Sequence, residues 1–266
     1  MQTVNKQTEK EYRDSQSTFG HIHQGLNLES WLTLTYENDV IRRDRYHGVA
    51  GKFLHTTNKL RVLEIAAGIG DFVMYCKKNF PIHEYSAHEL SRVQLESNIS
   101  RVAHYFGISE IPTLSFSPAE ELEYDDGVFD VVFIKASVHH FEDPQKSFGE
   151  IHRVLKPGGV VVFFEDPICL NVPIYRDYIK KNFSLAERKL GINEHIYTTN
   201  EYLGFGEKFS ETTFYIDPVL ISEFDTHQAK RSGIKKILGS LLRSNYFLFT
   251  QFMIWRFSSV VFVFKK

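Results

Sequence analysis

A short loop of small residues is the first feature of this sequence that could bind a ligand. The segment "RVLEIAAGIGDFVMY" begins at Arg61 and passes from an apolar run through Ala66-Ala67-Gly68-Ile69-Gly70 into a second apolar run. Glycine and alanine let a ligand touch the backbone, and a helix that follows such a loop offers unpaired amides and the positive end of its dipole. A tight turn without a ligand would use the same residues, so the loop alone leaves both interpretations open.

An acidic residue about twenty positions beyond the loop favours a nucleoside. Glu89 ends the second expected strand, and a carboxylate there can accept hydrogen bonds from both hydroxyls of a ribose. An exposed surface glutamate is the ordinary alternative. A dinucleotide site would need a glycine three residues after Gly70, where this chain has Val73. The sequence therefore predicts a nucleoside that lacks a pyrophosphate, and makes a nicotinamide-dependent oxidoreductase the less favoured alternative.

Two adjacent histidines are the candidate catalytic residues. His139 and His140 follow the fourth expected strand, and histidine titrates near neutral pH, which suits a general base. Packing and helix capping are the more common roles of such a pair. Glu165 and Asp166 end the fifth strand and could orient an acceptor hydroxyl or bind a metal with His139, although a solvated strand end is the more common role. Since no metal-ligand spacing is recognisable, we predict no metal site.

The elements that would position these residues follow from the hydrophobic pattern. Short apolar runs without polar alternation predict parallel strands buried on both faces, and amphipathic segments between them predict helices. Strands that alternate with helices give an α/β fold, a doubly wound and mostly parallel sheet whose ligands bind beyond the carboxyl ends of the strands. The expected strands are 59–65, 82–90, 112–118, 127–137 and 160–166, and the expected helices 29–46, 71–80, 91–107 and 143–155.

The chain reads as one domain with a tail and an embellished C-terminal part. Residues 1–28 are polar and predict a flexible N-terminal tail, and residues 29–266 predict a single domain. Within that domain we expect a cofactor-binding core at 60–166, an acceptor-side lid at 167–256 and a last strand at 258–266. The lid would contain a helix with loops around "TTNEYLGFGEKF" and a strand broken by a proline in "TFYIDPVLISEFDTH". Its residues His195, Tyr197 and Tyr202 would exclude water from an acceptor, or would simply pack in the core.

Composition limits the partners and the compartment. The formal charge is −2, with 42% hydrophobic and 24% charged residues, so a broad nucleic-acid footprint is not expected. Cys76 and Cys169 lack paired spacing, and the N-terminus lacks an apolar signal region, which favours the cytoplasm. Residues 230–256 join a basic segment to an apolar run. We expect an amphipathic helix there, which would contact a membrane surface, a lipid-like acceptor or a second copy in a homodimer.

Four segments in the right order and spacing resemble one family. "LEIAAGIGDF" looks like the E/D-x-G-x-G-x-G loop of class I S-adenosylmethionine-dependent methyltransferases, with Glu64 as the acid and Ala66 in the first glycine position. "HELSRVQLESN", "FDVVFIKASVHHFEDP" and "EIHRVLKPGGVVVFFED" are similar to later motifs of that family. The matches span residues 60–166. The resemblance implies a Rossmann-like, seven-stranded sheet with a helical insertion near the C-terminus.

The resemblance also implies which residues bind the cofactor, S-adenosyl-L-methionine. Glu89 would bind the ribose, Leu90 would pack on the adenine, and the loop after the fourth strand would face the methionine part. Pro118 stands where the family often has an aspartate that contacts the adenine amino group. The complete implied set is Glu64, Ala66, Gly68, Gly70, Glu89, Leu90, Ala119, Glu120, Lys135 and Ala136.

The function that the resemblance implies is methyl transfer to a small molecule. The acceptor atom would be O, N or C, on a lipid, a sugar or another biosynthetic intermediate. An S-adenosylmethionine-binding protein of the same fold with lost or changed chemistry is the alternative.

Overall fold

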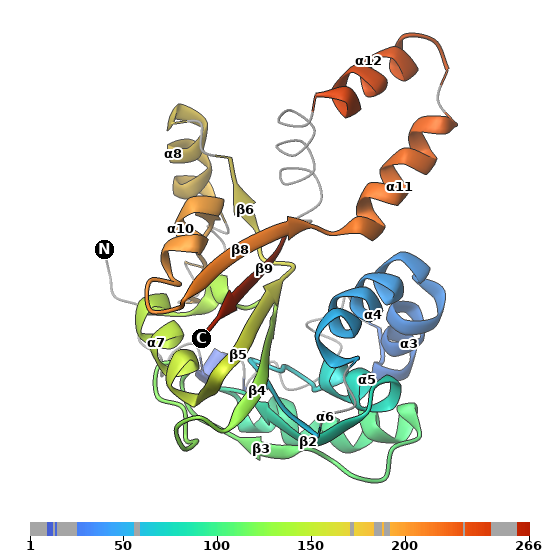
Figure 1. Cartoon of the computed structure of the whole chain (residues 1–266). Helices are drawn as coiled ribbons and strands as arrows, with labels where there is room; N and C mark the ends of the chain where they lie inside the picture. The colour runs from blue at the N-terminus through green and yellow to red at the C-terminus, as the bar shows by residue number, and fades with distance from the viewer. Residues whose placement is uncertain are drawn as a thin grey trace.

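One mixed sheet organises the chain (Figure 1). The structure is a computed structural model, and it describes residues 10–12, 14, 26–55, 59–170, 173–183, 188, 192–230, 232–245 and 260–266. Within these ranges the sheet has seven strands in the order β3-β2-β1-β4-β5-β9-β8, and β9 alone runs opposite to its neighbours. The strands are β1 (Leu60–Ile65), β2 (Ile82–His88), β3 (Thr113–Ser115), β4 (Phe129–Lys135), β5 (Leu155–Phe164), β8 (Glu211–Ile216) and β9 (Val260–Lys265). The doubly wound, mostly parallel, seven-stranded sheet is thus confirmed.

Helices cover both faces of this sheet (Figure 1). One face carries α3 (Leu28–Thr33), α4 (Val40–Leu54), α5 (Asp71–Asn79) and α6 (Arg92–Phe106), and the other carries α7 (Pro144–Val154) and α10 (Thr199–Gly204). Two helix starts confirm the sequence signals. The Ser91 hydroxyl accepts a hydrogen bond from the Gln94 amide (3.1 Å), and Pro144 occupies the first turn of α7.

The N-terminal helical segment is interrupted rather than continuous. A π-helical turn (Leu34–Asn38) follows α3, and α4 starts anew after Asp39, whose side chain accepts from the Arg42 amide (2.9 Å). Leu28 is buried in the core beside α4 and α5. This interruption brings Trp31, Arg42 and Tyr46 to the cavity described below.

The C-terminal hundred residues differ most from the prediction. The predicted break at Pro218 is present, because β8 ends at Ile216, but the segment that follows is a helix, α11 (Pro218–Ala229), rather than more strand. Asp217 explains the change, since its carboxylate accepts from the Val219 amide (3.0 Å) and proline is favoured at a first helical position. The remaining elements are α8 (Pro173–Asn182), α12 (Gly233–Ser244) and a separate two-stranded sheet of β6 (Ile168–Cys169) and β7 (Tyr197–Thr198).

In Figure 1, α11 and α12 stand away from the sheet. Ile237 and Leu241 of α12 are 61% and 62% exposed, whereas Leu242 packs on Leu220 and Phe224 of α11. None of the helices that the structure describes is both long and apolar enough to cross a membrane. Residues 246–256, which belong to the predicted contact segment 230–256, lie outside the described ranges.

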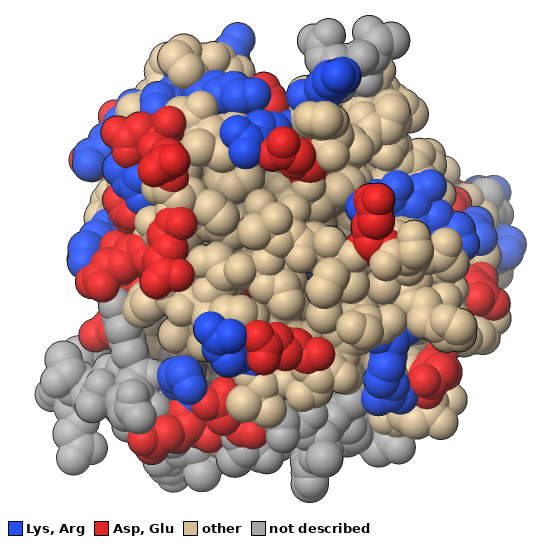
Figure 2. Space-filling view, turned by 90° about the horizontal axis from the view of Figure 1, so that it is seen from below, with Lys and Arg blue, Asp and Glu red and all other residues tan. Residues whose placement is uncertain are grey.

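Charges of both signs are interspersed on the face of the molecule seen from below in Figure 1. Figure 2 shows groups of Lys and Arg beside groups of Asp and Glu, arranged around a largely uncharged centre. This face therefore offers no continuous basic surface.

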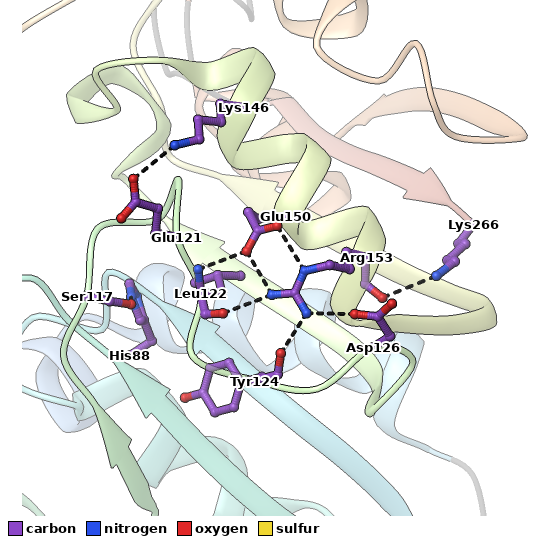
Figure 3. A network of polar contacts seen from close by, with 10 residues as sticks. All are labelled: His88, Ser117, Glu121, Leu122, Tyr124, Asp126, Lys146, Glu150, Arg153 and Lys266. Atoms are coloured by element: carbon purple, nitrogen blue, oxygen red, sulfur yellow. Dashed lines mark hydrogen bonds and ion pairs between the residues drawn. The ribbon is translucent and has the colours of Figure 1, made fainter.

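One arginine joins the "RVLKPGG" segment to the loop before β4 (Figure 3). The Arg153 guanidinium donates to the Glu150 carboxylate (2.7 and 2.9 Å), to the carbonyls of Leu122 and Tyr124 (2.8 and 2.7 Å) and to Asp126 (2.8 Å). The Glu150 carboxylate also accepts from the Leu122 amide (3.0 Å). This network fixes the segment that connects the cavity wall to β4.

We expect Arg153→Met to destabilise the fold without touching the cavity. The substitution removes five hydrogen bonds and deprives two carbonyls and two carboxylates of the Arg153 donor, which should lower the free energy of unfolding by about 2–3 kcal/mol. Chemical denaturation monitored by circular dichroism measures it. Lys146→Met, which removes an exposed ion pair to Glu121, is the control and should not change stability measurably. Equal stabilities for the two variants would contradict a structural role for Arg153.

Candidate functional site

A cavity of about 430 Å³ lies at the carboxyl ends of β1, β2, β4 and β5, where a doubly wound sheet binds its ligands. Its lining comes from α3 and α4, from the loops that follow these four strands, and from the segment 117–120. Acidic side chains outnumber basic ones in this lining, which suits a ligand with a positive charge. The acids are Asp71, Glu89, Glu120, Glu142 and Glu165, and the bases are Arg42 and Lys135.

The backbone turns sharply where three central strands reach the cavity. Ala66, Ala136 and Glu165 follow β1, β4 and β5, and their φ angles are 54°, 51° and 65°. Non-glycine residues adopt this left-handed region at a cost of about 1–2 kcal/mol. All three line the cavity, so the turns present backbone to the ligand. At the first position of this loop, glycine would adopt the same left-handed conformation as Ala66 without that cost.

The sequence-predicted residues of the first loop divide into two groups. Ala66 and Gly68 line the cavity, whereas Glu64 and Gly70 are absent from its lining. The buried Glu64 carboxylate accepts from the Val73 amide (2.8 Å) in the first turn of α5, and burial raises its pKa to about 8. At Gly70 a Cβ atom would collide with Ile99 of α6. Glu64 and Gly70 therefore support the loop from the side that faces away from the cavity.

Glu89 lies in the wall of the cavity at the end of β2 and is 4% exposed. One carboxylate oxygen accepts from the Gly68 amide (2.8 Å), and the other accepts from the amides of Leu90 and Ser91 (2.8 and 3.2 Å). Because these donors fix its rotamer, the carboxylate is held between the first loop and β2. Leu90 also lines the cavity.

The segment after β3 forms another wall. Ser117, Pro118, Ala119 and Glu120 all line the cavity. The Glu120 carboxylate accepts from the amides of Glu142 and Asp143 (3.0 Å each), which ties this segment to the loop after β4.

Beside the first loop, the predicted residue Lys135 is paired with Asp71 and Tyr36, which the sequence analysis did not single out. The Asp71 carboxylate accepts hydrogen bonds from Lys135 Nζ (2.8 Å) and from the Tyr36 hydroxyl (2.6 Å). Burial alone would lower the pKa of Lys135, but the carboxylates of Asp71 and Glu64 raise it above its usual value. Asp71 and Lys135 both line the cavity. The position of Asp71 directly after Gly70 was the available signal.

The two histidines occupy different positions. His140 lines the cavity, and its Nδ1 contacts the Asn193 carbonyl (2.9 Å). His139 is absent from the cavity lining, and its Nδ1 contacts Asp166 Oδ1 (2.7 Å). The ring centroids lie 4.0 Å apart. Glu165 lines the cavity and accepts from Arg45 and Tyr46 (3.0 Å each).

The aromatic residues proposed for a lid belong to the core instead. Tyr202 is fully buried, packs on Phe163 and Phe262, and donates to the Pro167 carbonyl (3.1 Å). Tyr197 packs against Tyr202. Neither residue, nor His195, is part of the cavity lining.

Residues 63–163 match the family model described as "Methyltransferase domain". This chain carries a class I methyltransferase domain. The match runs from within β1 almost to the end of β5 and therefore includes all four segments of the predicted cofactor site. S-adenosylmethionine is the methyl donor of this enzyme class, so residues 63–163 are accordingly an S-adenosylmethionine-dependent methyltransferase domain.

Two curated relatives share the methyltransferase domain. The demethylmenaquinone methyltransferase of Chlorobaculum tepidum is 29% identical over 196 residues, which are 70% of this chain and 70% of that protein. The glycine/sarcosine/dimethylglycine N-methyltransferase of Actinopolyspora halophila is 27% identical over 171 residues, which are 64% of this chain and 28% of that longer protein.

A solved structure shares the fold of the methyltransferase over nearly the whole chain. Phosphoethanolamine N-methyltransferase 2 of Haemonchus contortus, in complex with S-adenosyl-L-methionine, superposes with a TM-score of 0.58 and 19% identity. The match covers 96% of this chain and 60% of that one. At this identity the likeness shows the fold alone.

The burial of His88 predicts that the stability of the protein depends on pH. This histidine lines the cavity at the end of β2, is 2% exposed, and contacts the Ser117 hydroxyl through Nε2 (3.2 Å; Figure 3). Burial lowers its pKa to about 4, below the value of about 6.5 in an unfolded chain. Between these pH values the unfolded chain binds the proton and the folded chain does not.

We therefore expect the free energy of unfolding to fall by about 3 kcal/mol as the pH drops from 6.5 to 4, through this residue alone. The full stability is present above pH 6.5. Denaturation at several pH values checks it, with His88→Gln as the comparison, since glutamine does not titrate. Identical pH profiles for the wild type and His88→Gln would rule out this role for His88.

Proposed function

We propose that this methyltransferase transfers the methyl group of S-adenosylmethionine to an acceptor bound in the same cavity. The observation that carries the proposal is the composition of the cavity lining. Part of the lining comes from the matched domain, namely the first loop, Glu89-Leu90 and the segment 117–120. Another part comes from Trp31, Arg42, Tyr46 and Glu165, outside the matched residues 63–163. One cavity is thus walled both by cofactor motifs and by residues available to a second ligand.

In the cofactor half, we assign the ribose hydroxyls to Glu89 and the adenine to Leu90 and Ala119. The backbone of Ala66, Gly68 and Ala136 would approach the cofactor, because their turns expose it to the cavity. Asp71 and Lys135 would lie at the methionine part. The excess of acidic side chains in the lining complements the sulfonium charge.

The transfer needs positioning more than acid or base chemistry. The acceptor atom attacks the methyl carbon, the carbon–sulfur bond breaks, and its electron pair stays on sulfur, which leaves S-adenosylhomocysteine. Holding the reacting atoms about 3 Å apart and in line can contribute about 7–11 kcal/mol to lowering the barrier.

The acceptor half favours a compact molecule with an apolar body and a polar group. Trp31, Tyr46 and Phe141 supply ring surfaces, while Arg42 supplies a positive charge. The relatives are named for acceptors as different as glycine and demethylmenaquinone. Most of these candidate acceptor contacts lie outside the matched domain. The match to the methyltransferase domain therefore does not determine which acceptor this protein binds.

His140 would act on the acceptor from the cavity wall, as a base or in another role, and the neighbouring His139 would support it. A base requires a ring nitrogen with a lone pair beside the acceptor. The contact of His140 Nδ1 with a carbonyl oxygen leaves that lone pair on Nε2.

A product assay tests the proposed function. The purified chain is incubated with S-adenosylmethionine and a panel of amine, hydroxyl and quinol acceptors. We expect S-adenosylhomocysteine to form only with a matching acceptor, in equal amount to the methylated product. Binding of S-adenosylmethionine without turnover on any acceptor class would favour a protein of this fold with lost or changed chemistry.

We also propose that α12 contacts either an anionic membrane surface or a second copy of the chain. The exposed Ile237 and Leu241 support this proposal. Co-sedimentation with anionic vesicles and light scattering distinguish the two partners. A monomer that does not bind vesicles would contradict both.

A further inference from the structure

A cluster of metal-ligating side chains lies where the 3-10 turn Val138–His140 meets the segment that precedes β7. His139, His140 and Glu194 each offer one ligand atom, and these atoms all lie within 4.8 Å of one another. Their side chains are 12%, 21% and 11% exposed. His140 also lines the cavity, so an ion held here would be within reach of a bound acceptor.

Both imidazole rings are oriented as metal ligands usually are. Nδ1 of His139 contacts a carboxylate oxygen of Asp166 (2.7 Å). Nδ1 of His140 contacts the Asn193 carbonyl (2.9 Å) and also lies 3.4 Å from Glu194 Oε1. Since these oxygens can only accept, each Nδ1 carries the proton, and the lone pair of a neutral ring lies on Nε2. Metal-ligating histidines nearly always donate their other ring nitrogen to a carboxylate or a carbonyl in this way.

The backbone around the cluster is fixed from both sides. The Asn193 side-chain amide donates to the His140 carbonyl (2.9 Å), and the His195 amide donates to the His139 carbonyl (3.0 Å). These bonds hold the chain segment that carries Glu194 against the two histidines. A site whose ligands are already in place binds an ion without a large ordering cost.

The local charge also favours a cation. Asp166 is 2% exposed, and its second carboxylate oxygen, Oδ2, has no hydrogen-bond partner among the described residues. A buried carboxylate that is only half satisfied is costly unless positive charge lies nearby. Glu194 adds a second acid to the same cluster. A divalent ion on the histidines would offset both.

We propose that His139, His140 and Glu194 bind a divalent first-row transition-metal ion, with zinc as its representative. Two neutral imidazoles and one carboxylate leave a four-coordinate zinc ion one open position. That position would take an oxygen of the acceptor and lower its pKa, so the ion would replace a histidine base. The link to the acceptor rests on the proposed function, whereas the binding of the ion does not.

Zinc titration of the chelator-treated full chain tests the inference. Calorimetry should give one zinc ion per chain, and cobalt should give visible absorption bands of a low-coordinate site. We expect His140→Ala and Glu194→Gln each to lower zinc affinity at least tenfold and to remove the cobalt bands. Asp166→Asn should weaken binding less, because it disturbs only the orientation of His139.

His83→Gln is the matched control, because His83 is an exposed histidine beside a glutamate, Glu84. It should bind zinc like the wild type. Melting curves without metal show whether each variant is folded, and Glu194→Gln keeps the test valid should a histidine variant unfold. Absence of stoichiometric zinc binding, or equal affinities for Glu194→Gln and the control, would overturn the inference. Calorimetry with S-adenosylhomocysteine on the same samples reports separately on the proposed function.

Discussion

Replacing Glu89 by alanine should weaken the binding of S-adenosylhomocysteine at least tenfold. In the assignment proposed for this residue, its carboxylate accepts two hydrogen bonds from the ribose hydroxyls, and hydrogen bonds to a charged group contribute about 1.5–3 kcal/mol each. The same carboxylate accepts from the amides of Gly68, Leu90 and Ser91. Its removal would therefore also release the first loop from β2.

Calorimetry with wild type and variant measures this loss directly. Glu89→Gln separates the two contributions, because a glutamine oxygen can still accept from a backbone amide, while its amide group cannot accept from a ribose hydroxyl. We expect Glu89→Gln to keep the stability of the wild type better than Glu89→Ala and yet to bind poorly. Glu84→Ala is the matched control, since Glu84 lies on the same strand but is exposed and paired with Arg61. An unchanged affinity in Glu89→Ala would refute the ribose assignment.

The core of the fold was predictable because its signals are local. The run before Ala66 is apolar on both faces, Ser91 and Pro144 mark helix starts, and Gly68 and Gly70 mark the loop. Each of these patterns depends only on neighbouring residues and on the period of a buried strand or helix. The position of Glu89 in the cavity wall could be predicted for the same reason, since parallel strands end at a common edge.

The acceptor side was less predictable because distant segments build it. Trp31 and Arg42 reach the cavity from two helical segments separated by the break at Asp39, and Glu194 reaches His140 across more than fifty residues that include α7, β5, β6 and α8. Neither approach leaves a periodic or spaced motif in the sequence. The expectation of no metal site stays a prediction, and it rested on ligand spacing in sequence, which does not reveal Glu194 beside the two histidines.

The two glycines of the first loop should respond differently to alanine. Both have positive φ angles, 60° for Gly68 and 79° for Gly70, so each substitution costs about 1–2 kcal/mol in backbone strain. At Gly70 the new methyl group would also overlap the Ile99 side chain, which is 1% exposed and cannot move into solvent. We expect Gly70→Ala to lower the free energy of unfolding by about 2–4 kcal/mol.

At Gly68 the same methyl group meets no atom closer than 4.0 Å, at Gln94. Because Gly68 lines the cavity, that free space would be taken by the cofactor in the assignment proposed above. Gly68→Ala should therefore lose only the stability that the backbone strain costs. It should, however, bind S-adenosylhomocysteine at least tenfold more weakly. Denaturation measures the stability of the two variants, and calorimetry measures their affinity for S-adenosylhomocysteine. Calorimetry on Gly70→Ala is done at low temperature, where the variant is folded. Wild-type affinity in Gly68→Ala would show that the cofactor does not approach this backbone, and wild-type stability in Gly70→Ala would show that the loop need not pack on α6.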